Sequence, residues 1–393
     1  MEKIIKAAVD RGASDVHIKA GDVFRARIHG ELVPLTKQAL SPEQTRAIAL
    51  TLMSNAGDQA RLDEILDYDC SWSAPGIGRF RVNIMRQRSS IMIVMRVIPF
   101  EIPTFESLGL PPVMAQIAQS ERGMILVTGA AGSGKSSTMA ALIHQINQDA
   151  KRHILTIEDP IEFLHTDINS SVTQREVGVD TTDMKTGLRA ALRQDPDVIM
   201  IGDMRDADMV DTAIKAAETG HLLLATIHTP DAQSTVLRLV AMFPVEQQEA
   251  IRIRLAESLT AVISQRLLPK RDGHGRAAAA EIMLVTPTIR DMIGDRNRIG
   301  EIRDYIADGD EQNGMQTFDQ ALTELVISGE VAFETARAAA SNPSDFELKT
   351  RMFSRISHRY EMNDISTPPL GAPATTPRRD ADGVDRNTDP FKQ

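Results

Sequence analysis

The sequence predicts a mixed α/β fold: a smaller α+β domain, then a doubly wound α/β domain with a parallel sheet, then a set of helices. Three observations predict it. Between residues 123 and about 286, short apolar runs alternate with amphipathic segments, the pattern of parallel strands joined by helices. Residues 1 to about 98 instead alternate apolar and polar positions over short runs, as half-buried strands do. From residue 288 to about 359 the apolar spacing is helical.

Length and composition limit the possible classes of protein. The chain has 393 residues, of which 42% are hydrophobic and 25% charged, so two or three folded domains are expected. A net charge of −10 disfavours a motor that tracks nucleic-acid phosphates, which needs clustered Lys and Arg, although net charge hides local patches. No run of about 18 apolar residues and no secretory signal is found, so no membrane insertion is expected. Cys70 is the single cysteine, which fits the cytosol and which we interpret as a core residue.

The first domain, residues 1–98, is expected to hold two helices and a sheet. Glu2–Arg11 is amphipathic and predicts the first helix. Ser41 is expected to cap the second helix, because Pro42 suits its first position and Gln44 completes a capping box. The runs expected to be strands are Asp15–Lys19, Val23–Ile28, Tyr68–Trp72, Arg79–Met85 and Ile91–Ile98. The proline-containing residues 99–112 then predict a semi-rigid hinge.

The second domain, residues 113–286, carries the alternating pattern. Its expected strands are Met124–Thr128, His153–Ile157, Asp197–Ile201 and Leu222–Ile227, and its expected helices include Ser137–Gln148, Asp183–Gln194 and Asp206–Glu218. A long helical segment is expected over Pro244–Leu268, followed by a turn at Asp272–Gly275 and a strand at Ala277–Val285. The C-terminal helical region, residues 287–365, contains the expected helices Thr288–Ile293, Met315–Ser328 and Phe333–Ala340. Residues 366–393 are rich in charge and proline and are predicted to be disordered.

A glycine-rich loop lies between the first strand of the second domain and the helix that follows it. The loop matches the phosphate-binding pattern G-x-x-x-x-G-K-[ST], and the flanking strand and helix are the context that the pattern requires. Its backbone amides and the helix N-terminus favour phosphate oxygens, Lys135 would reach the β- and γ-phosphates of ATP, and the Ser136 hydroxyl would hold Mg²⁺. The residues expected to bind the nucleotide here are Gly129, Ala130, Ala131, Gly132, Ser133, Gly134, Lys135, Ser136 and Ser137.

Carboxylates at the ends of two other strands supply candidates for metal binding and water activation. The apolar run at residues 198–201 ends in Gly202 and Asp203, a Walker B pattern that would place Asp203 near Mg²⁺, although acidic residues end many buried strands. Glu158, Asp159 and Glu162 follow the strand at residues 153–157. Glu158 is placed to polarise the attacking water and Glu162 to lie near the nucleotide, while the alternative is a solvated acidic turn.

Two histidines flank the strand at residues 222–227. His221 precedes it and His228 follows it. A histidine at a strand end beside a nucleotide can hydrogen-bond a phosphate, so both are candidates for nucleotide binding. A structural role is the alternative for each.

Five motifs in fixed order carry a resemblance to a known family. They are Gly129–Ser136, Thr156–Glu162, Gln174–Gly178, Asp195–Ile199 and Ala217–His221, and Gly12–His17 adds to them near the N-terminus. With these motifs the chain resembles the secretion ATPase superfamily, and within it the type IV pilus retraction (twitching motility) ATPases, over residues 10 to about 350.

The resemblance implies a RecA-like P-loop NTPase core, a PAS-like N-terminal domain, ATP and Mg²⁺ as ligands, and a homohexameric ring. It places Glu158 at the catalytic glutamate of the Asp box and His228 in the His box. It also places Arg81 and Arg96 in the arginine-bearing strands that approach the γ-phosphate, where the alternative is solvated strand arginines. The implied setting is the cytoplasmic side of the inner membrane, with a pilus platform protein and a PilT paralogue as partners.

Three departures from the family pattern refine this reading. Asp203 stands where members usually carry Glu; Asp is roughly 1.5 Å shorter, and misplacement of that order costs about 100-fold in rate. A single cysteine excludes the four-cysteine zinc module of the assembly ATPases and favours retraction. The Ala-Ile-Arg-Asn-Leu-Ile signature of the PilT group is present only as Thr288–Ile293, while Gly314–Leu322, Ser341–Asp345 and the polar tail are more similar to the PilU group.

The motifs predict an ATPase, and the resemblance implies that it is hexameric and drives pilus retraction. Two alternatives stay open. One is a ring subunit that binds ATP, hydrolyses it weakly and supports an active paralogue, for which Asp203 is the favouring feature. The other is a nucleic-acid motor, which the net charge disfavours.

Overall fold

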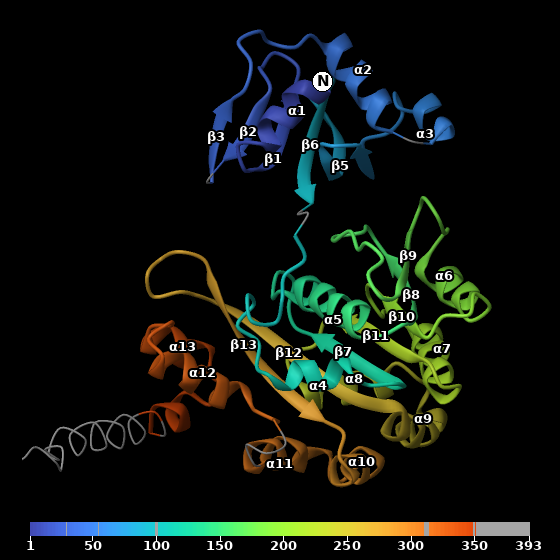
Figure 1. The fold of residues 1–393 in the computed structure, drawn as a ribbon, viewed down its shortest axis with the longest axis vertical. Coiled ribbons are helices and arrows are strands. Elements are labelled where there is room, and N and C mark those ends of the chain that lie inside the picture. The colour runs from blue at the N-terminus through green and yellow to red at the C-terminus, as the bar shows by residue number, and fades with distance from the viewer. Residues whose placement is uncertain (29, 54, 99–100, 310–313, 349, 351–393) are drawn as a thin grey trace, which may run out of the picture. The chain divides into compact units, whose positions relative to one another are not determined.

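The computed structural model describes residues 1–28, 30–53, 55–98, 101–309, 314–348 and 350 (Figure 1). Its contacts divide the chain into two units, Met1–Pro343 and Ser344–Gln393. The first unit contains two sheets, each built from a continuous part of the chain. Residues 99 and 100 of the predicted hinge, residues 310–313, 349 and 351–365 of the predicted helical region, and all of the predicted disordered tail lie outside the described residues.

The N-terminal sheet is antiparallel, with strand order β3-β2-β1-β6-β5-β4. One of its faces is apolar: Phe80, Val82 and Ile84 alternate along β5 and are buried against helices α1 and α2. The opposite face carries polar side chains, including the arginines discussed below. The elements are α1 (Glu2–Val9), β1 (Ala13–Lys19), β2 (Arg25–Ile28), β3 (Glu31–Pro34), α2 (Pro42–Leu52), α3 (Ala56–Ala60), β4 (Asp67–Ala74), β5 (Gly78–Gln87) and β6 (Ser90–Ile98).

Helix α2 begins as the sequence predicts. Ser41 Oγ accepts a hydrogen bond from the Gln44 backbone amide at 3.3 Å, and Gln44 Oε1 accepts one from the Ser41 amide at 2.8 Å. Pro42 occupies the first helical position. The capping box is therefore confirmed. The short strand β3 and helix α3 were not predicted, because runs of four and five residues carry too little periodic signal.

The second sheet has seven strands in the order β13-β12-β7-β11-β10-β8-β9. All neighbours are parallel except β12 and β13, which form an antiparallel hairpin. The four predicted parallel strands are confirmed. The strands are β7 (Gly123–Thr128), β8 (His153–Glu158), β9 (Ser171–Glu176), β10 (Val198–Ile201), β11 (Leu222–Ile227), β12 (Leu259–Pro269) and β13 (Arg276–Leu284).

Helices cover both faces of this sheet and divide the core in two. Along β7, Ile125 and Val127 pack into the cluster formed with α4 and α5, while Met124 and Leu126 pack into the opposite cluster. Both faces of the strand are buried, which explains its unbroken apolar run. One face carries α4 (Val113–Ala118) and α5 (Lys135–Asp149), and the other α6 (Met184–Ala191), α7 (Ala207–Glu218), α8 (Ala232–Ala241), α9 (Val245–Ser258) and α10 (Pro287–Gly294).

The predicted helix over Pro244–Leu268 is wrong. Helix α9 ends at Ser258, and Leu259–Pro269 is the strand β12 in the interior of the sheet. Most of β12 is buried on both faces, so its buried positions follow one another and do not alternate with exposed ones. Such a run cannot be separated from a buried helix by periodicity alone. The strand β9 and helices α4 and α8 were also not predicted.

The remaining helices follow the hairpin. Helix α12 begins with a second capping box, in which Thr317 and Gln320 exchange side-chain and backbone hydrogen bonds. The guanidinium of Arg266 on β12 lies 3.8 Å from the centre of the Phe318 ring of α12. These elements are η1 (Ile299–Glu301), α11 (Ile302–Asp308), α12 (Phe318–Ile327) and α13 (Phe333–Ala339). Among the described residues no helix has the length and apolar character needed to cross a membrane.

Candidate functional site

The residues expected to bind the nucleotide come together at one edge of the second sheet. β7, β11, β10 and β8 are neighbours and parallel, so their carboxyl ends lie side by side. The chain leaving these ends contains, in that order, the glycine-rich loop, His228, Asp203 and Glu158. A pocket at this edge is lined by Ser136, Glu158, Glu162 and Asp203, among others. The topology thus collects chemical groups that lie far apart in the sequence.

Three glycines shape the loop between β7 and α5. Gly129, Gly132 and Gly134 have φ angles of 144°, 76° and 94°, a region that side chains rarely adopt. At Gly129 there is also no room, since a Cβ would lie 2.4 Å from Ser133 Oγ and 2.6 Å from the Gln265 carbonyl oxygen. The loop is therefore a tight backbone cradle that only glycine permits at this position.

The tip of the loop and the start of α5 offer backbone groups to a ligand. Ala130 and Ala131 are exposed, and α5 begins at Lys135. The first backbone amides of a helix have no hydrogen-bond partner within it, so those of Ser136 and Ser137 are available to a ligand. They lie at the N-terminus of a fifteen-residue helix, where the helix dipole is positive. This arrangement fits a phosphate group.

The Lys135 side chain folds back over the loop. Its Nζ donates to the carbonyl oxygens of Gly129 and Ala130, each at 2.9 Å, and the residue is buried. Burial lowers the pKa of Lys135, while the nearby Asp203 and Glu162 carboxylates oppose that shift. The ammonium group is therefore held at the glycine-rich loop by carbonyl oxygens.

His228, from the loop after β11, reaches both Lys135 and Asp203. Its Nδ1 lies 3.4 Å from Lys135 Nζ and its Nε2 lies 3.7 Å from Asp203 Oδ2. Because an ammonium group can only donate, Nδ1 must present its lone pair to Lys135, which places the ring proton on Nε2, toward Asp203. His228 therefore connects the phosphate loop to the carboxylate after β10.

Asp203 follows β10 after Gly202 and lines the same pocket as Ser136. Its Oδ2 accepts a hydrogen bond from Arg205 Nε at 2.7 Å, and this contact raises the pKa of the Arg205 guanidinium. Hydroxyl and carboxylate oxygens suit Mg²⁺, which is commonly held by one or two protein ligands together with phosphates. Over the described part of the chain, no three His, Cys, Asp or Glu side chains form a metal site of their own.

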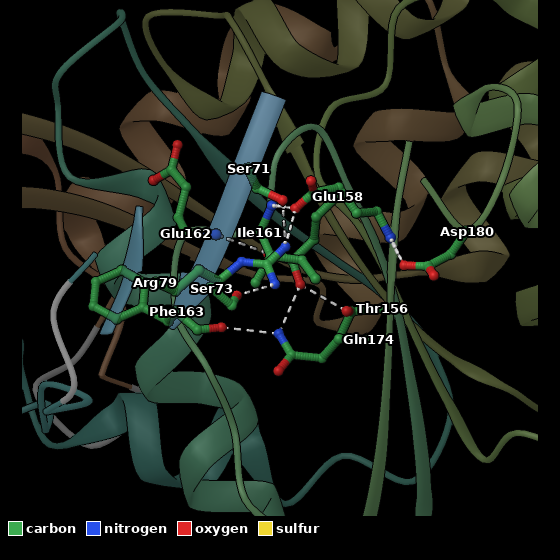
Figure 2. Close-up of polar contacts among 11 residues, drawn as sticks. Ser71, Ser73, Arg79, Thr156, Glu158, Ile161, Glu162, Phe163, Gln174 and Asp180 are labelled. Carbon is green, nitrogen blue, oxygen red and sulfur yellow. Dashed lines mark hydrogen bonds and ion pairs between the residues drawn. The ribbon is translucent and has the colours of Figure 1, made fainter. Parts of the chain in front are cut away.

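Glu158 ends β8 inside a hydrogen-bond network (Figure 2). Its Oε1 accepts from Thr156 Oγ1 at 2.6 Å and from Gln174 Nε2 at 3.0 Å, and its Oε2 accepts from the Glu162 amide at 3.4 Å. The residue is 6% exposed, and burial raises the pKa of its carboxyl while these hydrogen bonds oppose the shift. A carboxyl whose pKa is moved toward neutral pH suits general-base chemistry.

The N-terminal arginines named from the sequence lie on the polar face of their sheet. Arg81 and Arg96 are directly opposite each other on β5 and β6, and Arg96 Nε donates to Asp15 Oδ1 at 2.9 Å. Arg79 lies two residues before Arg81, hence on the same face, and its guanidinium binds the carboxylate of Glu176 at the end of β9. Arg79, and not Arg81 or Arg96, thus makes the ion pair with the second sheet.

His221 lies elsewhere. It precedes β11, and the six residues of that strand separate it from His228 by about 20 Å. Its Nδ1 lies 3.0 Å from the Ala216 carbonyl oxygen, and it lines another pocket with Arg152 and Asp197. Within one chain, the structure does not bring His221 to the glycine-rich loop.

Sequence reasoning missed several residues at the site. Arg205 binds Asp203, Arg276 Nη1 donates to the carbonyl oxygen of Gly132 in the loop at 3.3 Å, and Gln174 binds Glu158. Gln174 stands in a motif that the sequence analysis quoted without a role, so the alternation of side chains along β9 could have revealed it. Arg276 lies on the hairpin strand β13 and carries no local signal.

Comparisons with known proteins agree with this geometry. A family model described as type II/IV secretion system protein matches residues 1–335. The type IV pilus ATPase PilU of Pseudomonas aeruginosa is 41% identical over 355 residues, covering 90% of this chain and 92% of that protein. The type IV pilus retraction ATPase PilT of the same organism is also 41% identical, over 344 residues, covering 88% and 99%. The two relatives are thus equally similar in identity.

A solved structure of the pilus retraction motor PilT with bound ADP superposes on this chain. The TM-score is 0.80 at 43% identity, and the match covers 88% of this chain and 98% of the other. The ATPase DotB of Legionella pneumophila follows with a TM-score of 0.76 at 29% identity, covering 86% and 94%. The similarity therefore extends over both sheets of the first unit.

Proposed function

The chain belongs to the type II/IV secretion system protein family and is an ATP-hydrolysing enzyme, and we propose that it drives type IV pilus retraction. The proposal is supported by the chain's similarity to two pilus ATPases, PilU and PilT. The observation that carries the hydrolytic part of the proposal is the meeting of Lys135, His228, Asp203 and Glu158 at one sheet edge.

In the proposed mechanism the loop amides and Lys135 bind the β- and γ-phosphates of ATP. Ser136 and Asp203 would hold Mg²⁺, which neutralises charge on the phosphate oxygens. The Glu158 carboxylate orients a water and takes its proton as the water oxygen attacks the γ-phosphorus. The bond to the β–γ bridging oxygen breaks, ADP leaves with the electron pair, and the proton passes from Glu158 to solvent or phosphate.

Coupling to movement is proposed to depend on two parts of the chain joined by a hinge. The proposed division is an N-terminal domain at 1–98, a hinge at 99–112, an ATPase domain at 113–286 and a helical region at 287–365. Arg81 and Arg96 would approach the γ-phosphate, so binding and loss of that group would change the relation between the two domains. His228, beside Lys135, would respond to the same group.

The proposed assembly is a homohexameric ring at the cytoplasmic face of the inner membrane. It would act on a pilus platform protein, in the PilU role beside a PilT paralogue. The features of residues 288–293, 314–322 and 341–345 support that role, and PilU and PilT are both 41% identical to this chain.

The decisive experiment removes Lys135. We expect Lys135→Ala to abolish steady-state ATP turnover and to lose ADP binding measured by calorimetry with Mg²⁺. Equal turnover with and without Lys135 would refute the mechanism. Size-exclusion chromatography with light scattering, with and without ATP, tests the hexamer, and restoration of twitching in a strain that lacks its own copy tests retraction.

A second candidate function is a ring subunit that binds ATP but hydrolyses it weakly. Asp203 supports it, because the carboxylate is one methylene shorter than the family's Glu and is paired with Arg205. This subunit would bind ADP as tightly as an active motor and would still show slow single-turnover hydrolysis.

A further inference from the structure

Strand β9 places two polar side chains on the same face. Gln174 and Glu176 are two residues apart on a strand that pairs in parallel with β8, so both point to one side of the sheet. On that side lies the chain that follows Glu158 (Figure 2). β9 is at the edge of the sheet, beside β8.

Gln174 uses both ends of its amide. Its Nε2 donates to Glu158 Oε1 at 3.0 Å and to the Phe163 carbonyl oxygen at 2.9 Å, and its Oε1 accepts from the His165 amide at 2.9 Å. One side chain thus fixes the carboxylate of Glu158 and two backbone points of the segment that leaves it. No other amide side chain of the described residues donates to Glu158.

Glu176 connects the same segment to the N-terminal sheet. Its Oε2 accepts from the Ile161 amide at 3.0 Å and also binds the guanidinium of Arg79. Arg79 is itself held by Ser71 Oγ at 3.0 Å and Ser73 Oγ at 3.2 Å across the β4–β5 pair. Glu176 is 2% exposed, so its charge has little access to water and Arg79 is its cationic partner.

We propose that Gln174 is a positioning residue for Glu158, and that Glu176 makes this position depend on Arg79 of the N-terminal sheet. The proposal rests on the proposed role of Glu158. β9 then connects the two sites. The Arg79–Glu176 pair fixes the position of the backbone at Ile161, and Gln174 fixes the position of the Glu158 carboxylate. Movement of the N-terminal sheet would reach the water-activating group without passing through the nucleotide.

The first test replaces Gln174 by Met, which keeps its length and removes both kinds of hydrogen bond. We expect kcat to fall about tenfold to a hundredfold with KM and the calorimetric Kd for ADP unchanged within twofold, because carboxylate alignment affects the chemical step. The hydrogen bond from Gln174 lowers the pKa of Glu158, so its loss should raise that pKa. The acid limb of the kcat profile should therefore move to higher pH. Thr173→Ala, on the opposite face of β9, is the matched control and should leave both quantities unchanged.

A Gln174→Met enzyme with unchanged kcat and pH profile would overturn the positioning role. A loss of kcat that comes with a lower melting temperature and weaker ADP binding, and with an unmoved acid limb, would also overturn it, because that pattern indicates general structural damage. Gln174→Asn keeps the amide on a side chain that is one methylene shorter, so its kcat should be higher than that of Gln174→Met. Equal kcat values for the two variants would contradict the role of the hydrogen bond.

The second test is a double-mutant cycle on kcat with Arg79→Gln, Glu176→Gln and the double variant. If the pair acts as one unit, each single change lowers kcat and the double change lowers it no further. Independent, multiplying effects, or no effect of Arg79→Gln, would overturn the link to the N-terminal sheet. The proposed function fails separately: wild-type protein that turns over ATP no faster than Lys135→Ala refutes the ATPase mechanism before β9 is considered.

Discussion

His228 Nδ1 lies 3.4 Å from the Nζ of Lys135, so the loop after β11 reaches the lysine of the phosphate loop. Lys135 is otherwise held by two carbonyl oxygens of its own loop. The imidazole therefore lies beside the ammonium group that is expected to bind the terminal phosphate, and its other nitrogen faces Asp203. His228 thus lies within reach of both Lys135 and Asp203.

Replacing His228 by Ala should lower kcat about tenfold and change the calorimetric Kd for ADP less than threefold. The reason is that ADP lacks the γ-phosphate, near which His228 is proposed to act. His221→Ala, at the other end of β11, is the comparison variant, because within one chain it lies far from the loop. A large loss of ADP affinity in His228→Ala would contradict this assignment and indicate a structural role.

Replacing Glu158 by Gln should lower kcat by about 10²- to 10⁴-fold, the range for loss of a general base. The variant should also melt higher at neutral pH. Burial raises the pKa of Glu158 in the folded state, so the folded state binds its proton more tightly than the unfolded state does. That contribution to stability is present below the unfolded pKa and is lost as pH rises through the folded pKa.

The melting temperature of Glu158→Gln should therefore exceed that of wild type at pH 8, with the difference shrinking toward pH 4. Calorimetry at both pH values checks this. In wild type, kcat should decline on the acid side at a pH above the usual pKa of a glutamate. Thr173→Ala, which leaves Glu158 in place, should show no such pH-dependent difference. Equal melting temperatures of Glu158→Gln and wild type at every pH would contradict the raised pKa.

Asp203→Glu tests whether the shorter carboxylate limits the reaction. Asp203 lines the same pocket as Ser136, so we expect single-turnover hydrolysis to change less than tenfold in either direction. Rapid-quench measurement with excess enzyme checks this. A rise of about 100-fold, the rate cost of a misplacement of roughly 1 Å, would instead support the weakly hydrolysing ring subunit. Ser136→Ala should lower the rate in both cases if the hydroxyl holds Mg²⁺.

The parts of the fold predicted correctly are those with strong local signals. The apolar runs of β7, β8, β10 and β11 and the capping box at Ser41 can each be recognised from a few neighbouring residues. The strand β12 was misread as helix because a strand buried on both faces loses its alternation. Edge strand β9 was missed because its polar residues Gln174 and Glu176 serve contacts to other segments and not the core.

The same reasoning applies to the site. The phosphate loop, Asp203, Glu158 and His228 follow from motif and strand order, because parallel strands bring their ends together. Arg79 could not be selected over Arg81 and Arg96 from the sequence, since all three alternate on one face of two paired strands. Which of them meets Glu176 depends on tertiary packing.

Cys70 should be nearly inert in the folded protein. Burial raises the pKa of its thiol to about 12, and its Sγ lies 3.8 Å from the Leu52 carbonyl oxygen. Since only the thiolate reacts, a pKa about three units above that of a free cysteine lowers the reactive fraction about 10³-fold at pH 8. We expect labelling by a disulfide reagent to be slower by that order in native buffer than in denaturant. Equal labelling rates in native buffer and in denaturant would show that the thiol is exposed and that its pKa is not raised.

Replacing Gly129 by Ala should damage the phosphate loop more than the same change at another glycine of positive φ. The added Cβ at Gly129 would lie 2.4 Å from Ser133 Oγ and 2.6 Å from the Gln265 carbonyl oxygen, and the latter belongs to the rigid strand β12. Gly273 also has positive φ, at 77°, but an added Cβ there meets nothing within 4 Å. Gly273→Ala therefore isolates the backbone strain, of order 1 kcal/mol, from the collision. We expect Gly129→Ala to cost at least about 2 kcal/mol by urea unfolding and to lose ADP binding. An equal loss of unfolding free energy in the two variants would mean that the loop can move away from β12. The description of the loop as tightly packed against that strand would then be wrong.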